Sequence, residues 1–209
     1  MELTAAQVVG VLDRVGIIAF AFSGVEVGFR RRLDVFGLLV MGVVTATGGG
    51  LLRDLALARV PYVLVRQDYL LWAVFSSFLA IVFVVRSQRI PAVIVAVADA
   101  AGLGAFAVAG ALAGITASLP VPAVVVLAML TANGGGVIRD LLADRVPLVL
   151  RAEINATAAG AGGVVVWLFD PISTGGAAAL GLAVTAAIRV AGIAFDLHLP
   201  VPGGRSRPK

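Results

Sequence analysis

The chain has 209 residues, of which 60% are hydrophobic and 13% are charged, and its formal net charge is +4. A soluble protein of this length needs a more polar surface, so the composition excludes an ordinary soluble domain and indicates that lipid covers much of the chain. In such a protein the positive charge indicates how the chain is oriented in the membrane, so no nucleic-acid partner is predicted.

Seven segments are long and apolar enough to cross a bilayer, whose hydrocarbon core takes about 20 helical residues to span. Continuous apolar runs such as 73–85 and 121–130 favour helices over the alternating strands of an outer-membrane barrel. The predicted fold class is therefore an all-α integral membrane protein. The predicted spans are 8–29, 35–57, 69–85, 92–116, 121–142, 153–169 and 174–195.

Basic residues gather in the loops on one side of these spans. Short loops rich in arginine and lysine stay in the cytoplasm. We therefore predict a multi-pass protein of the inner or plasma membrane, with the N-terminus outside and the tail 200–209 in the cytoplasm. Arg59 and Arg66, after the second span, are exceptions to this distribution. The basic residues on the predicted cytoplasmic side are Arg30, Arg31, Arg32, Arg86, Arg89, Arg145, Arg151, Arg205, Arg207 and Lys209.

The strongest pattern is an internal repeat with an offset of 86 residues and no gap. The segment 45–55, TATGGGLLRDL, aligns with 131–141, TANGGGVIRDL, and the sequence Arg-Val-Pro follows both segments at the same distance. Further identities join the first and fourth spans. In them, Asp13, Gly16, Ala19, Phe20, Ala21, Gly24 and Gly28 align with Asp99, Gly102, Ala105, Phe106, Ala107, Gly110 and Gly114.

Each copy of the repeat contains three spans, so the second copy enters the membrane with the opposite orientation. The sequence therefore predicts a 3+3 inverted repeat plus one extra helix. We place the first copy at 8–85, the second at 92–169 and the seventh helix at 174–195, within a single transmembrane domain of residues 1–199. Proteins of this architecture bind or conduct their substrate near the midplane, where broken helices from the two copies meet.

Three consecutive glycines lie inside the second helix of each copy. A glycine within a helix costs about 1 kcal/mol relative to alanine, so the triplets predict a kink or break in the second and fifth helices. Carbonyls freed there can replace a cation's water shell, and the threonine and asparagine side chains before each triplet supply further oxygens. These predicted pathway residues are Thr45, Thr47, Gly48, Gly49, Gly50, Thr131, Asn133, Gly134, Gly135 and Gly136.

Small residues also let membrane helices approach closely, which is the alternative interpretation of these glycines. We prefer helix packing for the two GxxxG patterns, which contain Gly24, Gly28, Gly110 and Gly114. For the triplets we prefer a functional role, because an Arg-Asp pair follows each of them inside an otherwise apolar span.

These charged pairs are Arg53 with Asp54 and Arg139 with Asp140. A charge near the bilayer centre costs about 2.5–3.5 kcal/mol on insertion scales, so the pairs indicate a functional site. Neighbouring residues of a helix point about 100° apart. We therefore predict pairing across the pseudo-twofold axis, Arg53 with Asp140 and Arg139 with Asp54.

A fixed positive charge in a cation path repels the ion unless it is neutralised or moved. The two arginines are therefore predicted either to gate the path or to act as structural struts beside it. Asp13 and Asp99 either neutralise them or lie at a helix interface. The sequence has no nucleophile with a base, metal-ligand cluster or phosphate-binding loop, so we predict no enzyme, no cofactor and no tightly bound metal.

The doubled Gly-Gly-Gly-x-x-Arg-Asp motif, at 48–54 and 134–140, resembles the prokaryotic branch of the trimeric intracellular cation (TRIC) channels. The resemblance implies a homotrimer with one pore per subunit, a path between the second and fifth helices, and transient passage of potassium or sodium ions. Animal members carry a lysine-containing motif and bind a phosphoinositide near it. This sequence has Arg-Asp after the triplets and lacks that motif, so no phosphoinositide site is predicted. The alternative is a secondary transporter of a small solute such as glycine, because carriers share this architecture.

Overall fold

The computed structural model describes residues 4–87, 92–150 and 154–195, and within these ranges the chain is all-helical. The predicted cytoplasmic tail 200–209 lies outside the described residues. The long helices are α1 (Ala5–Arg30), α2 (Val35–Ala56), α4 (Gln67–Ser87), α5 (Ala92–Thr116), α6 (Val121–Leu142), α7 (Ile154–Phe169) and α8 (Thr174–Ala194). The short elements are α3 (Tyr62–Val65) and the 3-10 turn η1 (Leu148–Leu150).

The long helices agree with the seven predicted spans to within a few residues at each end. Six of them are long and apolar enough to cross a membrane. The remaining one, α7, is apolar but has only 16 residues, and at about 1.5 Å per residue it falls short of the bilayer core. The predicted all-helical membrane class is confirmed, with six or seven spanning helices.

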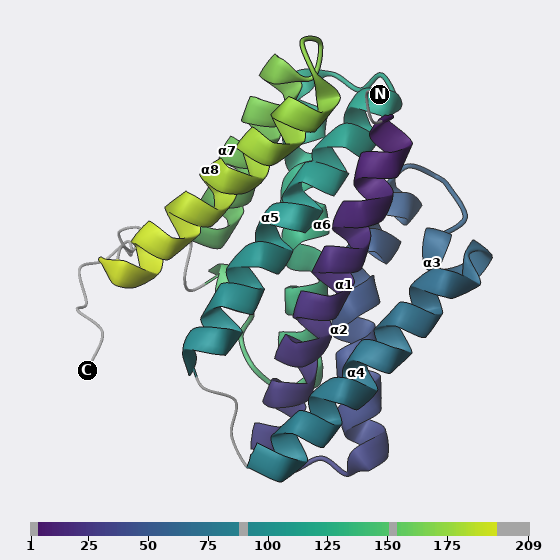
Figure 1. The fold of residues 1–209 in the computed structure, drawn as a ribbon, viewed down its shortest axis with the longest axis vertical. Coiled ribbons are helices and arrows are strands. Elements are labelled where there is room, and N and C mark those ends of the chain that lie inside the picture. Colours follow the sequence, from purple (N-terminus) through teal and green to yellow (C-terminus); the bar gives the residue numbers. More distant parts are fainter. Residues whose placement is uncertain (1–3, 88–91, 151–153, 196–209) are drawn as a thin grey trace.

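The helices alternate in direction and pack in two similar groups (Figure 1). In the first group α1 packs on α2 and α4, and in the second α5 packs on α6 and α7. The two groups meet where α1 packs on α5 and α2 packs on α6. Helix α8 packs on α7 and α5 and lies at the edge of the bundle, outside the two groups.

Backbone conformation repeats with the same offset as the sequence. Among the described residues, four that are not glycine have positive φ: Arg32, Ala58, Ser118 and Asp144, with φ of 57°, 52°, 54° and 51°. They form two pairs that are each 86 residues apart. Each residue follows the end of a long helix, where the left-handed conformation commonly terminates helices. The repeat is therefore structural as well as sequential.

Helices α1 and α5 run in opposite directions and cross through reciprocal contacts. Phe20 of α1 packs edge-to-face on Phe106 of α5, with ring centroids 5.3 Å apart. Each ring also covers a glycine of the other helix: a Cβ on Gly16 would lie 2.7 Å from the Phe106 ring, and one on Gly102 would lie 2.6 Å from the Phe20 ring. These matched contacts place a pseudo-twofold axis between the two helices.

Helices α2 and α6 stay α-helical through their glycine triplets, so the prediction of broken helices is wrong. The triplets lie where the two helices cross. A Cβ on Gly49 would lie 2.1 Å from the carbonyl oxygen of Thr131, and one on Gly135 would lie 2.2 Å from that of Thr45. The glycines therefore allow direct contact between the two backbones. A bend that keeps the helical hydrogen bonds stays a prediction.

The GxxxG glycines face neighbouring helices of the same chain. A Cβ on Gly24 would lie 2.4 Å from the carbonyl oxygen of Met41 in α2, and one on Gly28 would lie 3.0 Å from Leu38. In the second half, Gly110 and Gly114 face α6 in the same way. Both patterns thus bring the first and second helices of a repeat close together.

Candidate functional site

Arg53 lies at the centre of a buried group of charges, which we name the Arg53 cluster. Its Nη1 and Nη2 donate to the two carboxylate oxygens of Asp13 at 2.8 and 3.1 Å, and its Nε donates to Asp54 at 2.9 Å. All three residues are at most 4% exposed. One arginine and two aspartates give the cluster a formal charge of −1. Paired hydrogen bonds of this kind are the strong form of arginine–carboxylate contact.

Asp54 also holds the segment that follows α2. Its second carboxylate oxygen accepts a hydrogen bond of 2.8 Å from the backbone N–H of Tyr62, the first residue of α3. Its backbone carbonyl accepts a bond of 2.9 Å from the N–H of Arg59. The charged cluster is therefore tied to the short helix beside it.

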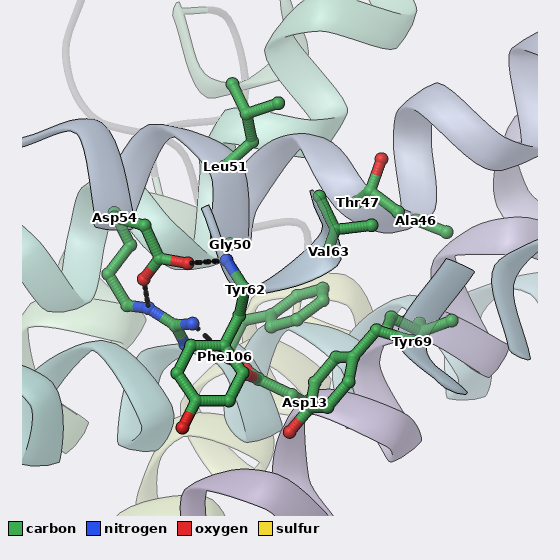
Figure 2. A pocket seen from close by; sticks show the side chains of 12 residues that line it. Asp13, Ala46, Thr47, Gly50, Leu51, Asp54, Tyr62, Val63, Tyr69 and Phe106 are labelled. Carbon is green, nitrogen blue, oxygen red and sulfur yellow. Dashed lines mark hydrogen bonds and ion pairs between the residues drawn. The ribbon is translucent and has the colours of Figure 1, made fainter. Parts of the chain in front are cut away.

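Two hollows meet at the Arg53 cluster. A vestibule of about 130 Å³ lies between the first turns of α1 and the residues Tyr62 and Tyr69, and the cluster forms part of its wall. A smaller cavity of about 20 Å³ continues past the cluster along α2, beside Thr47 and Gly50. That volume holds about one water molecule. Figure 2 shows Asp13, Asp54, Tyr62 and Tyr69 arranged around this smaller space.

Aromatic rings and a second ion pair join α1, α3 and α4 around the vestibule. The guanidinium of Arg14 lies 5.0 Å from the ring centroid of Tyr69 and donates to Asp68 at 2.6 Å. Tyr69 packs edge-to-face on Tyr62 of α3, with centroids 5.7 Å apart. A cation over an aromatic face is attracted to the ring's electrons, so these contacts fix the vestibule wall.

Arg139 holds the position in the second half that Arg53 holds in the first, but not all of its partners are equivalent. We name Arg139 and its partners the Arg139 cluster. Its Nε donates to Asp140 at 2.9 Å, and its Nη1 donates to the hydroxyl of Ser23 at 2.5 Å. The second oxygen of Asp140 accepts a bond of 2.9 Å from the N–H of Leu148, as Asp54 does from Tyr62. One arginine and one aspartate give this cluster a formal charge of zero.

An opening of about 330 Å³ lies beside the Arg139 cluster. Asp140 forms part of its wall together with the loop residues Asp144, Arg145, Val146 and Leu148. Helices α2 and α6 run in opposite directions (Figure 1), so their C-terminal ends lie at opposite ends of the bundle, and this opening and the vestibule approach the two clusters from opposite sides.

The predicted pairing across the pseudo-twofold axis is wrong. Arg53 and Arg139 each bind the aspartate that follows them, because the long arginine side chain can reach the next residue of its own helix. The two Arg-Asp pairs also lie at opposite ends of the bundle, which keeps Arg53 away from Asp140. Asp13 neutralises Arg53, one of the two roles considered for it, whereas Asp99 lies 3.4 Å from Arg189 of α8.

The predicted polar side chains before the triplets donate hydrogen bonds within their own helices. The hydroxyls of Thr45, Thr47 and Thr131 and the amide of Asn133 each donate to the carbonyl four residues earlier. Thr45 and Thr131 are fully buried near the crossing of α2 and α6, whereas Thr47 borders the small cavity with Gly50. The hollows therefore border only part of the predicted set.

Sequence reasoning did not single out Ser23, Tyr62, Tyr69 or Arg189. Ser23 aligns with Ala109 in the repeat, and Tyr69 aligns with Asn155, so the repeat carried no signal for them. Arg189 lies in α8, which has no counterpart in the repeat. Tyr62 had one available signal, since it directly follows the repeated Arg-Val-Pro sequence.

Comparison with known proteins finds a family model described as a glycine transporter, which matches residues 10–85 and 96–171. A UPF0126 membrane protein of Deinococcus radiodurans is 43% identical over 171 residues, covering 80% of this chain and 79% of the relative. The UPF0126 inner membrane protein YadS of Escherichia coli is 42% identical over 195 residues, covering 90% and 93%.

Solved structures are similar to the chain over more than 90% of its length. One TRIC cation channel superposes with a TM-score of 0.85 at 33% identity, over 95% of this chain and 98% of that channel. The TRIC orthologue from Rhodobacter sphaeroides superposes with a TM-score of 0.82 at 32% identity, over 91% and 99%. The chain belongs to the prokaryotic branch of the TRIC channel family. In this TRIC-family chain the family model matches twice, once in each half, and α8 lies outside both matches.

Proposed function

We propose that this chain forms a channel for monovalent cations, chiefly potassium and sodium, with one path in each subunit of a homotrimer. The observation that supports this most is the vestibule that ends at the buried carboxylates of Asp13 and Asp54, which share the single cation Arg53, while the exposed Arg59 also lines its wall. A negative group at the end of a hollow raises the local concentration of cations. The R. sphaeroides relative is itself named a trimeric cation channel.

The proposed path enters at the vestibule, passes the Arg53 cluster, and continues past Thr47 and Gly50 along α2 towards the Arg139 cluster. It runs beside α2, because Gly49 and Gly135 keep α2 and α6 in contact where they cross. In this proposal the guanidinium of Arg53 closes the path, and conduction requires that side chain to move.

We place the protein in the inner membrane, as the name of YadS states for that relative, with the N-terminus outside and the tail 200–209 in the cytoplasm. The proposed activity is passage of ions and involves no enzymatic reaction. The remaining predicted pathway residues of the triplet regions are proposed to support the path by holding the crossing of α2 and α6.

A secondary transporter of a small solute such as glycine is the second candidate. The description of the matching family model favours it, and an inverted repeat serves carriers as well as channels. The two candidates differ in mechanism, because a carrier changes conformation for every solute it moves whereas an open channel does not.

Planar-bilayer recording of the purified protein should show discrete current steps in potassium and sodium solutions, with reversal potentials that follow the cation gradient. Steps are expected because an open path passes many ions per opening. Protein-free bilayers treated with the same detergent serve as the control. Saturable uptake of labelled glycine by proteoliposomes, without current steps, would instead support the carrier.

Replacing Gly50 with leucine should remove most of the potassium current and leave the protein inserted and correctly sized. The position borders the small cavity, and a Cβ there would meet only the Arg53 guanidinium, at 3.8 Å, so the larger side chain would extend into the proposed path. Gly50→Ala is the matched control. Full current in the leucine variant would place the path elsewhere.

A further inference from the structure

The vestibule and the small cavity along α2 meet at a shared wall. The residues that line both hollows are Asp13, Arg53, Asp54, Tyr62 and Tyr69. Three of them are the ion-paired charges of the Arg53 cluster, and the other two are tyrosines whose rings pack edge-to-face beside Asp13 (Figure 2). An ion that moves from the vestibule into the small cavity therefore has to pass both the charged cluster and the tyrosine rings.

Tyr69 extends across this junction from α4 to α1. It is 6% exposed, whereas Tyr62 is 49% exposed. The Tyr69 hydroxyl lies beside Gly10 of α1, since a Cβ on Gly10 would lie 3.4 Å from the hydroxyl oxygen. Gly10 itself lines the vestibule. The ring of Tyr69 is thus the buried aromatic group between the two hollows, while Tyr62 lies nearer the surface.

Arg14 ties the first turn of α4 to α1 beside this ring. Its Nη1 donates to the carbonyl oxygen of Gly10 at 2.8 Å, and its Nη2 donates to the carboxylate of Asp68 at 2.6 Å. Asp68 directly precedes Tyr69, and the Arg14 guanidinium lies 5.0 Å from the centroid of the Tyr69 ring. The side chains of the ion pair are 33% and 35% exposed, so water competes with the pair and it can break at little cost.

The second half of the chain has no equivalent of these contacts. At the offset of 86 residues, the arginine, the aspartate and the tyrosine are replaced by Ala100, Ile154 and Asn155. These side chains provide neither an ion pair nor an aromatic ring. The Arg-Asp motif, in contrast, recurs in both copies. The repeated motif therefore builds both ends of the bundle, and the contacts around Tyr69 are an addition at the vestibule end.

We propose that the Tyr69 side chain is a second barrier in the ion path, and that the Arg14–Asp68 ion pair holds this barrier closed. This inference rests on the proposed channel function. When the pair breaks, the first turn of α4 can move away from α1 and carry Tyr69 with it, which joins the vestibule to the small cavity. Arg14 and Asp68 are positioning residues, because they act through the ring. Tyr69 and Arg53 thus close one junction from two different helices.

The barrier can be tested by thiol chemistry, because the chain contains no cysteine. T47C places a single thiol in the small cavity, and A6C places one in the vestibule, before the barrier. The measurement is the rate at which the cationic reagent aminoethyl methanethiosulfonate modifies each purified variant in detergent. The thiol of A6C should react faster than that of T47C, because the Tyr69 ring shields only the second position.

R14Q should raise the modification rate of T47C by about two- to fivefold, the population change expected from loss of a half-exposed ion pair. Y69A should raise the rate further, because the ring itself is gone, whereas Y69F keeps the ring and should keep the wild-type rate. R14Q/D68N should raise the rate no more than R14Q does, since both remove the same pair.

The rate at A6C is the matched control and should not change in R14Q. An unchanged rate at T47C in R14Q and Y69A would overturn the inference. An equal rise at A6C and T47C would also overturn it, because that result indicates a general loosening of the helices and no barrier between the two positions.

Single-channel recording in planar bilayers connects the barrier to conduction. R14Q should raise the open probability by the same factor as the thiol rate, because the same movement exposes Thr47 and opens the path. Wild-type current with an unchanged open probability in R14Q would overturn the inference and leave the channel function standing. Absence of cation current from the wild type would overturn the function itself, and the thiol rates would still report whether Tyr69 separates the two hollows.

Discussion

Replacing Arg53 with glutamine is expected to destabilise the protein by about 3–5 kcal/mol, because it leaves the carboxylates of Asp13 and Asp54 buried without a cation. The side chains of Arg53 and its two partners are at most 6% exposed, so bulk water compensates for little of the loss. The thermal unfolding midpoint of the purified protein in detergent measures the effect, with the monodisperse fraction on a sizing column as a second readout.

Arg14→Gln is the matched control for this change. Arg14 is also a helical arginine paired with an aspartate, but the side chains of that pair are 33% and 35% exposed, so the loss should be about 0–1 kcal/mol. The double variant D13N/R53Q removes opposite charges together and should recover part of the stability lost in R53Q, because Asp54 still lacks its cation. Equal destabilisation by R53Q and R14Q would mean that the buried cluster contributes nothing particular to folding.

The membrane fold was predictable because it depends on long-range averages of the sequence. An apolar stretch of about 20 residues in lipid must satisfy its backbone within one helix, whatever its neighbours are. The seven predicted spans therefore agree with the long helices. The repeat was predictable for a similar reason, since identical residues at one offset need no knowledge of tertiary contacts, and the paired positive-φ residues carry the same offset.

The partners of the charged residues were not predictable from the same information. The repeat made Arg53 and Arg139 equivalent, yet Ser23 and Arg189 make their surroundings differ. The sequence around Ser23 is that of an ordinary hydroxyl residue in an apolar helix, and Arg189 lies outside the repeat. Only the packing of α1 and α8 against the rest of the bundle decides which carboxylate or hydroxyl each arginine reaches.

The sequence of the glycine triplets allowed two structural interpretations. Glycine favours both a flexible backbone and the close approach of a second helix, and the local sequence is the same in both cases. The difference lies in what faces the missing side chain. For Gly49 that group is a backbone carbonyl of α6, far away in the sequence, so the interpretation of a broken helix could not be tested before the tertiary structure was known.

Gly49→Ala is accordingly expected to destabilise the protein by about 3 kcal/mol, at the upper end of the range for overpacked cores. The added Cβ would lie 2.1 Å from the carbonyl oxygen of Thr131, and a helix backbone cannot yield as the end of a side chain can. Helices α2 and α6 would have to separate along their crossing. The thermal unfolding midpoint in detergent measures the loss.

Gly50→Ala is expected to affect stability in the opposite way to Gly49→Ala. This contrast decides whether the triplet acts through backbone flexibility or through close helix packing. A Cβ on Gly50 would have Arg53 as its nearest contact, at 3.8 Å, so Gly50→Ala should keep or raise stability, by up to about 1 kcal/mol from helix propensity. Gly135→Ala and Gly136→Ala should repeat this contrast, because a Cβ would lie 2.2 Å from Thr45 in the first case and 3.8 Å from Arg139 in the second. If the triplets acted through backbone flexibility, neighbouring alanines would shift the midpoint alike, whereas close packing requires them to differ in both copies of the repeat.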